Sequence, residues 1–331
     1  MTRPKVFITR RLPDEARSLV AAVCEVAEWP DGDQPIPRAD LLRQVAEADG
    51  ILTLLTERVD AELLDAAPHC RVVANMAVGY DNIDVAELTR RGVLLTNTPG
   101  VLTETTADLV WALILATARR IVEGSNTIKH DRWTTWSPMF LTGYDVFGAT
   151  LGIVGAGQIG AAVARRAVGF NMPIIYHNRR PAPEFEADVG ARYRQLAELL
   201  READIVVVLV PLTNDTRGMF GAREFALMKP TSIFINAARG PIVKENDLVA
   251  ALQGGRPWAA GLDVFEQEPI GSEHPLAQLP NATIVPHIGS ATVRTRTLMA
   301  TTAARNLVAA LTGANVPNPV NPEVLPLGIK G

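Results

Sequence analysis

The sequence is poor in cysteine. It has only Cys24 and Cys70 in 331 residues, and the two lie far apart. No C-x-x-C pair and no cluster of cysteine and histidine occurs. The sequence therefore predicts neither a disulfide framework nor a zinc site, and we expect no bound metal.

An excess of positive charge is also missing. The formal net charge is −4, and the isoelectric point is about 5.8. Proteins that bind nucleic acids usually carry a basic face that neutralises phosphates. We therefore expect no nucleic-acid partner.

Long hydrophobic runs are absent as well. The longest apolar stretch, LVWALILATA from Leu109, is too short to span a bilayer. The first residues, MTRPKVFITR, lack the layout of a signal peptide. We expect a cytoplasmic protein with no membrane partner. Apolar residues make up 47% of the chain, which is enough to bury a sizeable core in two domains.

Short apolar runs alternate with helical patterns along the whole chain. Their hydrophobicity is continuous rather than alternating, which is typical of parallel strands covered on both faces. The pattern predicts an α/β fold. In the first part we expect strands at 5–9, 50–55, 71–76 and 93–97, with helices at 38–48 and 61–68 between them.

The pattern breaks at Pro99 and Gly100, where a different segment begins. We expect a helix with Thr103 as its N-cap that continues past Arg120. This helix is apolar around most of its circumference and should be buried. The residues after it, 133–145, are rich in aromatic and turn residues, and we expect an arm or loop there.

A second series of strands begins at Leu151. A helix at 290–313 follows it, and then a proline-rich tail at 315–326 that we expect along the surface. The expected strands of this series are 151–157, 173–177, 204–211, 232–238, 259–265 and 282–287.

A glycine turn, GAGQIG at 155–160, opens the second series. A G-x-G-x-x-G pattern is weak alone, but here a strand precedes it and a helical pattern follows it. Gly155 would permit the tight turn, Gly157 would let a pyrophosphate approach, and Gly160 would let helix and strand pack. The pattern favours dinucleotide binding over a purely structural turn.

The acidic residue that usually follows such a turn is missing. About 20 residues downstream, where an NAD-binding protein carries Asp or Glu, stand Asn178, Arg179 and Arg180. Arginine forms charge-assisted, often bidentate hydrogen bonds to phosphate. We therefore predict NADP(H) in preference to NAD(H), with Arg179 and Arg180 on its 2′-phosphate. A solvated basic turn is the alternative.

Polar residues follow separate strands late in the second series. Arg239, Glu268 and His287 each stand just beyond one apolar run. The carboxyl ends of strands line the ligand crevice of an open α/β sheet. Arginine binds carboxylates, histidine transfers protons near neutral pH, and a buried carboxylate would orient the imidazole. Each residue alone is typical of a surface or structural position, but their coincidence favours catalysis.

The chain resembles the D-isomer-specific 2-hydroxyacid dehydrogenase family, in particular its glyoxylate/hydroxypyruvate reductase branch, which includes 2-ketogluconate reductases. The resemblance covers nearly the whole length. The segments that carry it are ANMAVGYDNID, GVLLTNTPGVLTETTAD, LGIVGAGQIG, FINAARGPIV, AAGLDVFEQEP and VPHIGSAT.

The resemblance implies roles for particular residues. Arg239 would anchor the substrate carboxylate, His287 would donate a proton to the carbonyl, and Glu268 would be its partner. Val78 and Gly79 would offer backbone N–H groups to the carboxylate. The implied cofactor contacts are Thr106, Ala156, Gln158, Ile159, Pro211, Ala237, Ala238, Asp263 and Gly289, besides the glycines and the 178–180 segment.

The resemblance also implies two Rossmann-like, doubly wound domains with a cleft between them. Residues 1–100 and 288–331 would form the substrate-binding domain, and 101–287 the NADP-binding domain. A helix and arm at 103–140 would build a homodimer, with Trp136 reaching the neighbouring active site. The cleft would close on the substrate.

The sequence does not show which small 2-oxo acid is the substrate. Glyoxylate, hydroxypyruvate and 2-ketogluconate stay open, and phosphite oxidation lacks support. A dinucleotide-sensing corepressor is an alternative of a different class, which the intact set of Arg239, Glu268 and His287 disfavours. We expect the substrate pocket to be shaped by Leu54, Leu55, Met76, Trp136 and Met139.

Overall fold

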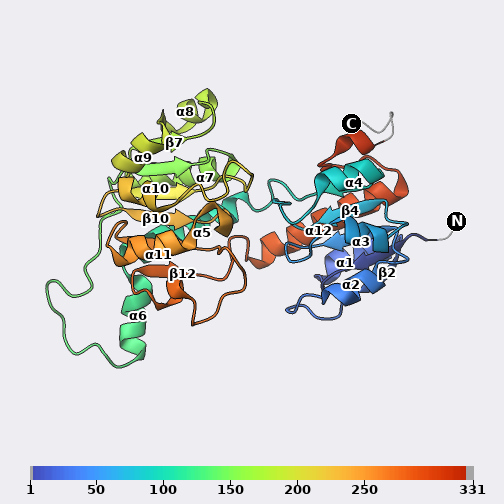
Figure 1. The fold of residues 1–331 in the computed structure, drawn as a ribbon, viewed down its shortest axis with the longest axis horizontal. Coiled ribbons are helices and arrows are strands. Elements are labelled where there is room, and N and C mark those ends of the chain that lie inside the picture. The colour runs from blue at the N-terminus through green and yellow to red at the C-terminus, as the bar shows by residue number, and fades with distance from the viewer. Residues whose placement is uncertain (1–2, 326–331) are drawn as a thin grey trace. The chain divides into compact units, whose positions relative to one another are not determined.

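The computed structural model describes residues 3–325. The last residue of the expected proline-rich tail, Pro326, lies outside the described residues, as do 327–331 of the expected substrate domain. The chain divides into two compact units (Figure 1). The first contains the described residues up to Leu102 and those from Ala291 onward, and the second is Thr103–Ser290.

The first unit is built on a parallel five-stranded sheet in the order β2-β1-β3-β4-β5. The long helix α12 packs against helix α1 and against strands β3 and β4 of this sheet. The strands are β1 (Lys5–Ile8), β2 (Glu25–Glu28), β3 (Gly50–Thr53), β4 (Val72–Asn75) and β5 (Leu94–Thr96). The helices are α1 (Asp14–Ala21), α2 (Arg38–Gln44), α3 (Ala61–Ala66), α4 (Val85–Arg91), α12 (Val293–Thr312) and the 3-10 helix η4 (Pro322–Val324).

The proline-rich tail lies at the surface only in part, because Val316 and Asn321 are buried while Asn315, Pro317, Pro322 and Glu323 are exposed. Pro319 forms an isolated bridge with Thr96, and the Val320 N–H donates to the carbonyl of Leu95. Asn321 is buried and bonds to backbone groups of Val93 and Leu95. Prolines cannot donate ladder hydrogen bonds, so the asparagine side chain takes over that function here.

The second unit is built on a parallel seven-stranded sheet in the order β12-β11-β10-β9-β6-β7-β8. Its chain order reverses between β6 and β9, which is the switch point where doubly wound sheets bind ligands. The strands are β6 (Leu151–Val154), β7 (Ile174–His177), β8 (Arg192–Tyr193), β9 (Ile205–Val208), β10 (Ile233–Asn236), β11 (Ala259–Leu262) and β12 (Ala282–Ile284). The helices are α5 (Thr103–Ala118), α6 (Ile121–Lys129), α7 (Gln158–Ala167), α8 (Pro183–Val189), α9 (Leu196–Glu202), α10 (Ala222–Leu227) and α11 (Glu245–Gln253), with 3-10 helices η1 (Val168–Phe170), η2 (Gly240–Ile242) and η3 (Pro275–Gln278).

Both faces of this sheet are covered, as the continuous hydrophobic runs predict. Ile205 and Val207 of β9 join one buried cluster, while Val206 and Val208 join the other. Alternate residues of a strand point to opposite faces, so a strand buried on both sides must be apolar throughout. The predicted α/β fold with two parallel sheets is confirmed.

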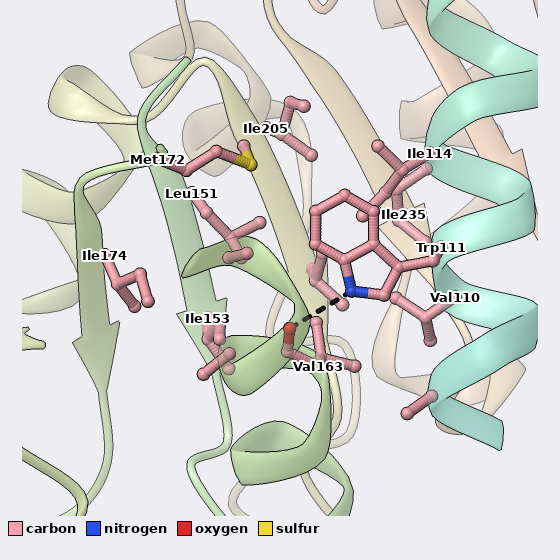
Figure 2. Packing of buried hydrophobic residues seen from close by; sticks show 14 of the residues in the cluster. Val110, Trp111, Ile114, Leu151, Ile153, Val163, Met172, Ile174, Ile205 and Ile235 are labelled. Atoms are coloured by element: carbon pink, nitrogen blue, oxygen red, sulfur yellow. Dashed lines mark hydrogen bonds between the residues drawn. The ribbon is translucent and has the colours of Figure 1, made fainter. Parts of the chain in front are cut away.

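Helix α5 is buried against its own unit. It packs on α7, β10 and β11. Trp111 lies at the centre of this contact, where its Nε1 donates to the carbonyl of Val163 at 3.1 Å (Figure 2). The helix ends at Ala118 and not beyond Arg120 as expected. Arg120 has φ 50°, a left-handed conformation that ends one helix and lets α6 start at Ile121.

No helix within residues 3–325 is both long enough and apolar enough to cross a membrane.

Candidate active site

The glycine turn joins β6 to α7 at the switch point of the second sheet. Gly155 has φ +107°, and a Cβ there would come within 2.6 Å of the Leu209 backbone. A Cβ at Gly160 would lie 2.3 Å from the carbonyl oxygen of Gly155. Gly157 faces open space, with nothing within 4 Å of an added Cβ. Two glycines are therefore required by the turn itself, and the third leaves its backbone accessible.

The amino end of α7 is suited to an anion. Its first turn contains no acidic residue, and Gly157 at the N-cap has no side chain to occupy the first amides. The Ala156 N–H donates to Oδ1 of Asn178 at 2.9 Å. Asn178 thus ties the end of β7 to the glycine turn, a contact that the sequence did not predict. Together these residues fit the pyrophosphate of a dinucleotide.

The arginine-bearing loop after β7 is held by two tyrosines. Buried Tyr176 donates its hydroxyl to Glu186 and accepts from the Ala182 N–H, both at 2.6 Å. The Tyr193 hydroxyl donates to the carbonyl of Asn178 at 3.4 Å. Between these anchors Arg179 and Arg180 are exposed. The loop therefore presents two cations on a fixed backbone.

Arg239, Glu268 and His287 follow three adjacent strands, β10, β11 and β12. His287 Nδ1 lies 2.7 Å from Oε2 of Glu268. The other carboxylate oxygen of Glu268 accepts from the Phe265 N–H at 3.0 Å. The charge of Arg239 also acts on Glu268. The structure therefore brings together the residues that the sequence selected as catalytic.

The electrostatics of Glu268 favour its charged form. Burial by itself would raise the pKa of this carboxyl, but the hydrogen bond and charge of His287, the Phe265 N–H and the charge of Arg239 outweigh it. The pKa of Glu268 therefore lies below its usual value. The carboxylate was expected to be buried, yet 35% of its side chain is exposed.

A second carboxylate, Asp263, fixes the backbone around His287. Its oxygens accept from the N–H groups of Ile288 at 2.6 Å and Gly289 at 2.9 Å. Burial raises the pKa of Asp263 to about 6, against the lowering effect of these N–H groups and of His287. His287 itself has φ 51°, so the chain turns sharply there. An added Cβ at Gly289 would come within 3.0 Å of Asp263 and 3.5 Å of Thr106, so these expected cofactor contacts lie side by side.

Gly240 is a site residue that the sequence did not single out. A Cβ at this position would lie 1.8 Å from the backbone carbonyl of Phe265. The turn after Arg239 is thus packed directly on the segment that leads to Glu268. The N-A-A-R-G order in the sequence was the available signal, since glycine after a functional residue often marks close backbone approach.

The remaining predicted cofactor contacts lie at the ends of their strands. Pro211 is exposed after β9, and its carbonyl accepts from Thr216 at 2.7 Å. Ala237 and Ala238 follow β10, where the Ala238 N–H donates to Asn236 Oδ1. Among the described residues, no group of three His, Cys, Asp or Glu side chains could hold a metal ion.

In the first unit, the predicted substrate-binding residues follow β3 and β4. Val78 and Gly79 are half-buried, and Leu54 packs beside the core. Met76 is buried in that core, so it supports the segment rather than forming part of its surface. Trp136 belongs to the second unit and is exposed.

A buried ion pair holds the Leu54 segment, and the sequence did not predict it. Glu57 accepts from Thr9, Thr53, Thr56 and the Leu54 N–H at 2.6–3.2 Å. Its partner Arg10 lies 3.4 Å away, and both side chains are nearly inaccessible. These groups come from the carboxyl ends of β1 and β3, where the strand order of the first sheet reverses. They join the two strands next to the predicted substrate residue.

Comparison with known proteins shows the family to which the chain belongs. The family model described as "D-isomer specific 2-hydroxyacid dehydrogenase, NAD binding domain" matches residues 111–289. A glyoxylate reductase from Thermococcus kodakarensis is 50% identical over 327 residues, 98% of each chain. The chain belongs to the D-isomer specific 2-hydroxyacid dehydrogenase family.

Solved structures agree with this assignment. A protein from Thermus thermophilus superposes with a TM-score of 0.89 at 44% identity, covering 96% of this chain and 99% of that one. An NADPH-dependent glyoxylate/hydroxypyruvate reductase from Sinorhizobium meliloti, solved with NADP and malonate, gives 0.83 at 33% identity, covering 96% and 97%. The family resemblance predicted from the sequence is confirmed, and this D-isomer specific 2-hydroxyacid dehydrogenase is an oxidoreductase.

Proposed function

We propose that this protein reduces a small 2-oxo acid, glyoxylate to glycolate or hydroxypyruvate to D-glycerate, with NADPH preferred over NADH. The observation that carries the proposal is the His287–Glu268 hydrogen bond of 2.7 Å, with Arg239 beside it, at the ends of adjacent strands. The relatives named glyoxylate reductase support the substrate class.

The proton donor is His287. Its Nδ1 is engaged by Glu268, so Nε2 is the nitrogen that can carry a proton to the substrate oxygen. The ionised carboxylate fixes the ring and stabilises the imidazolium. As the carbonyl oxygen gains negative charge, the proton moves from Nε2 to that oxygen, and Glu268 stays charged throughout.

Arg239 and the backbone amides of Val78 and Gly79 bind the substrate carboxylate in this proposal. A guanidinium suits a carboxylate because its planar fork can donate two parallel hydrogen bonds. Holding the carboxylate fixes the position of C2, so the contribution of these residues is mainly orientation. Leu54 and Trp136 are proposed to bound the pocket.

The proposed cofactor contacts all belong to the second unit. The glycine turn and the amino end of α7 would take the pyrophosphate, and Arg179 and Arg180 the 2′-phosphate. Thr106, Pro211, Ala237, Ala238, Asp263 and Gly289 would contact the remaining parts. When bound, the nicotinamide supplies the hydride that reduces C2.

The two proposed domains differ from the two compact units by only two or three residues at each boundary. Residues 1–100 and 288–331 are proposed as the substrate-binding domain and 101–287 as the NADP-binding domain. We place the enzyme in the cytoplasm.

A panel of assays tests the proposed reaction. Loss of reduced-nicotinamide absorbance is followed with glyoxylate, hydroxypyruvate and 2-ketogluconate, each with NADPH and NADH. The proposal expects the highest kcat/KM with one of the first two and NADPH. If kcat/KM is highest with 2-ketogluconate, the substrate is that of the related 2-ketogluconate reductases and not glyoxylate or hydroxypyruvate. Tight cofactor binding without turnover on any oxo acid would favour a dinucleotide-sensing corepressor.

Arg179→Asp is expected to weaken binding of NADPH far more than binding of NADH. The new carboxylate repels the 2′-phosphate of NADPH and can accept hydrogen bonds from the ribose hydroxyls of NADH. KM for NADPH should rise by about 10-fold or more, since charge-assisted bonds contribute roughly 1.5–3 kcal/mol, while KM for NADH changes little. Arg223→Asp, on the exposed side of α10, is the matched control. Equal KM values for NADPH in wild type and Arg179→Asp would contradict the assignment.

The pH dependence should differ between the two directions of the reaction. Reduction needs the protonated imidazole, so its kcat/KM should hold or rise as pH falls from 8 to 5, whereas oxidation should fall. The pKa of Glu268 lies below its usual value, so the stabilisation that its charge provides is lost only below pH 4.5. Glu268→Gln removes the charge that faces the imidazole, so the pH profile of reduction should differ from that of wild type. Superimposable profiles for wild type and variant would argue against the pairing.

We also propose a homodimer formed through α6 and the arm after it. Ile128, Trp133, Trp136 and Met139 are each more than half exposed, and no residue of α6 is buried. An apolar surface of this kind usually marks an interface. Ile128→Glu with Trp133→Glu is expected to convert the dimer to a monomer, measured by light scattering after gel filtration. Val168→Glu, at an equally exposed apolar residue of the same unit, should leave the mass unchanged.

A further inference from the structure

The segment 77–80, which follows β4 in the first unit, has an asymmetric pattern of backbone hydrogen bonds. Every carbonyl oxygen in it accepts a hydrogen bond from within the same unit. Ala77 O accepts from the Thr98 N–H at 2.9 Å, Val78 O from Asn97 Nδ2 at 2.9 Å, Gly79 O from Asn75 Nδ2 at 2.9 Å and Tyr80 O from the Ile83 N–H at 3.0 Å.

The N–H groups of the same segment differ from its carbonyls. None of the four donates a hydrogen bond to any group within residues 3–325. The peptide unit is planar and trans, so a fixed carbonyl also fixes the direction of the next N–H, which points the opposite way. The bond from Asn97 to Val78 O therefore orients the Gly79 amide. The bond from Asn75 to Gly79 O orients the Tyr80 amide.

Asn97 is itself held from the other end of the chain. Its carbonyl accepts from Asn306 Nδ2 of α12 at 2.9 Å, and Asn306 Oδ1 accepts from Asn318 Nδ2 at 3.1 Å. The Asn97 N–H donates to the carbonyl of Asn318 at 3.3 Å. A chain of asparagines thus runs from the C-terminal segment to the backbone of Val78.

Asn75 is hard to explain by stability alone. Its side chain is fully buried, and within the described chain its Oδ1 has no hydrogen-bond partner. A buried acceptor without a partner is unfavourable. What the side chain does provide is the single bond from Nδ2 to Gly79 O.

We propose that Asn97 and Asn75 are positioning residues that aim the amides of Gly79 and Tyr80 at the substrate carboxylate, beside the Val78 amide, whose direction is set by the bond from the Thr98 N–H to Ala77 O. This inference rests on the proposed function and adds to it the side chains that orient the anion-binding backbone. In this proposal the N–H groups of residues 78–80 bind one carboxylate with no charged residue of this unit. Losing their orientation should weaken binding of the anion without affecting the proton donor.

The test compares Asn97→Ala, Asn97→Ser and Asn75→Ala with wild type. KM for the 2-oxo acid should rise on the order of 10–100-fold, as expected when hydrogen bonds to a charged group are lost. Changes in kcat and in the dissociation constant for NADPH should be much smaller. Serine keeps a donor, so Asn97→Ser should recover part of the loss. Asn321→Ala is the control, because the Asn321 side chain is as buried as that of Asn75 but, among residues 3–325, bonds to Thr89, Val93 and Leu95 instead of to the 77–80 segment.

Binding of oxalate, measured by titration calorimetry, separates this inference from the proposed reaction. Oxalate affinity should fall in the Asn97 and Asn75 variants by the same factor as KM rises, and it should not fall in Asn321→Ala. If wild type reduces no 2-oxo acid but binds oxalate in an Asn97-dependent way, the proposed reaction is wrong, whereas the role of the asparagines in orienting the amides is supported. Unchanged KM and oxalate affinity in folded Asn97→Ala and Asn75→Ala would overturn the positioning, and so would an equal KM increase in Asn321→Ala.

Discussion

Replacing His287 by alanine is expected to lower kcat for 2-oxo acid reduction by about 10²–10⁴-fold, the range that general acid catalysis contributes. The imidazole is hydrogen-bonded to Glu268 through Nδ1, so the variant loses both the proton on Nε2 and the charge that Glu268 stabilises. Steady-state kinetics at saturating cofactor and substrate measures the effect. KM for the oxo acid should change much less than kcat, because Arg239 and the first-unit amides remain.

The conformation of His287 requires a second variant. Its φ of 51° is strained for alanine, whereas asparagine adopts the left-handed region more readily. His287→Asn should therefore keep the local backbone and still lose turnover. His69→Ala, at an exposed histidine of the first unit, is the matched control and should behave as wild type. Near-wild-type turnover in both His287 variants would refute the role of this residue as proton donor.

Gly240→Ala is expected to lower kcat/KM by about 10² or more. The added methyl would lie 1.8 Å from the Phe265 carbonyl, so the Arg239 turn and the segment leading to Glu268 must move apart. A displacement of about 1 Å in a positioning group can cost roughly 10²-fold in rate. The midpoint of thermal unfolding should also fall, because the clash is with backbone that cannot rotate away.

Gly271→Ala provides the comparison for this substitution. Gly271 is exposed, has no positive φ, and would place its Cβ in open space. It should change neither stability nor kinetics. If Gly240→Ala retains full kcat/KM, the close contact of the two segments does not set the geometry of Arg239 and Glu268.

Much of the site was predictable because it depends on residues near the ends of strands. The strand LGIV, the glycine turn and the following helix lie within one short stretch, so their spacing alone indicates the nucleotide turn. The sequence likewise shows directly that Asn178, Arg179 and Arg180 stand where an NAD-binding protein usually carries an acidic residue. Arg239, Glu268 and His287 could be grouped because parallel strands place their carboxyl ends along one edge.

Other features depend on contacts between distant residues. The end of α5 at Ala118 follows from the left-handed conformation of Arg120, which an arginine rarely adopts. The tail at 315–326 was expected along the surface because it is rich in proline. The bridge between Pro319 and Thr96 joins residues more than 200 positions apart, so no local pattern indicates it. The ion pair of Arg10 and Glu57 joins residues that follow β1 and β3 and are 47 positions apart in the sequence.

By itself, the sequence determined the α/β class, the family, the glycine turn and the candidate catalytic residues, because local periodicity and motif spacing carry that information. Only the tertiary structure decided which nitrogen of His287 faces Glu268, why Gly240 must lack a side chain, and how Asn75 and Asn97 hold the 77–80 backbone. These features arise where segments far apart along the chain come within hydrogen-bond or van der Waals distance, and no local pattern of residues records such distances.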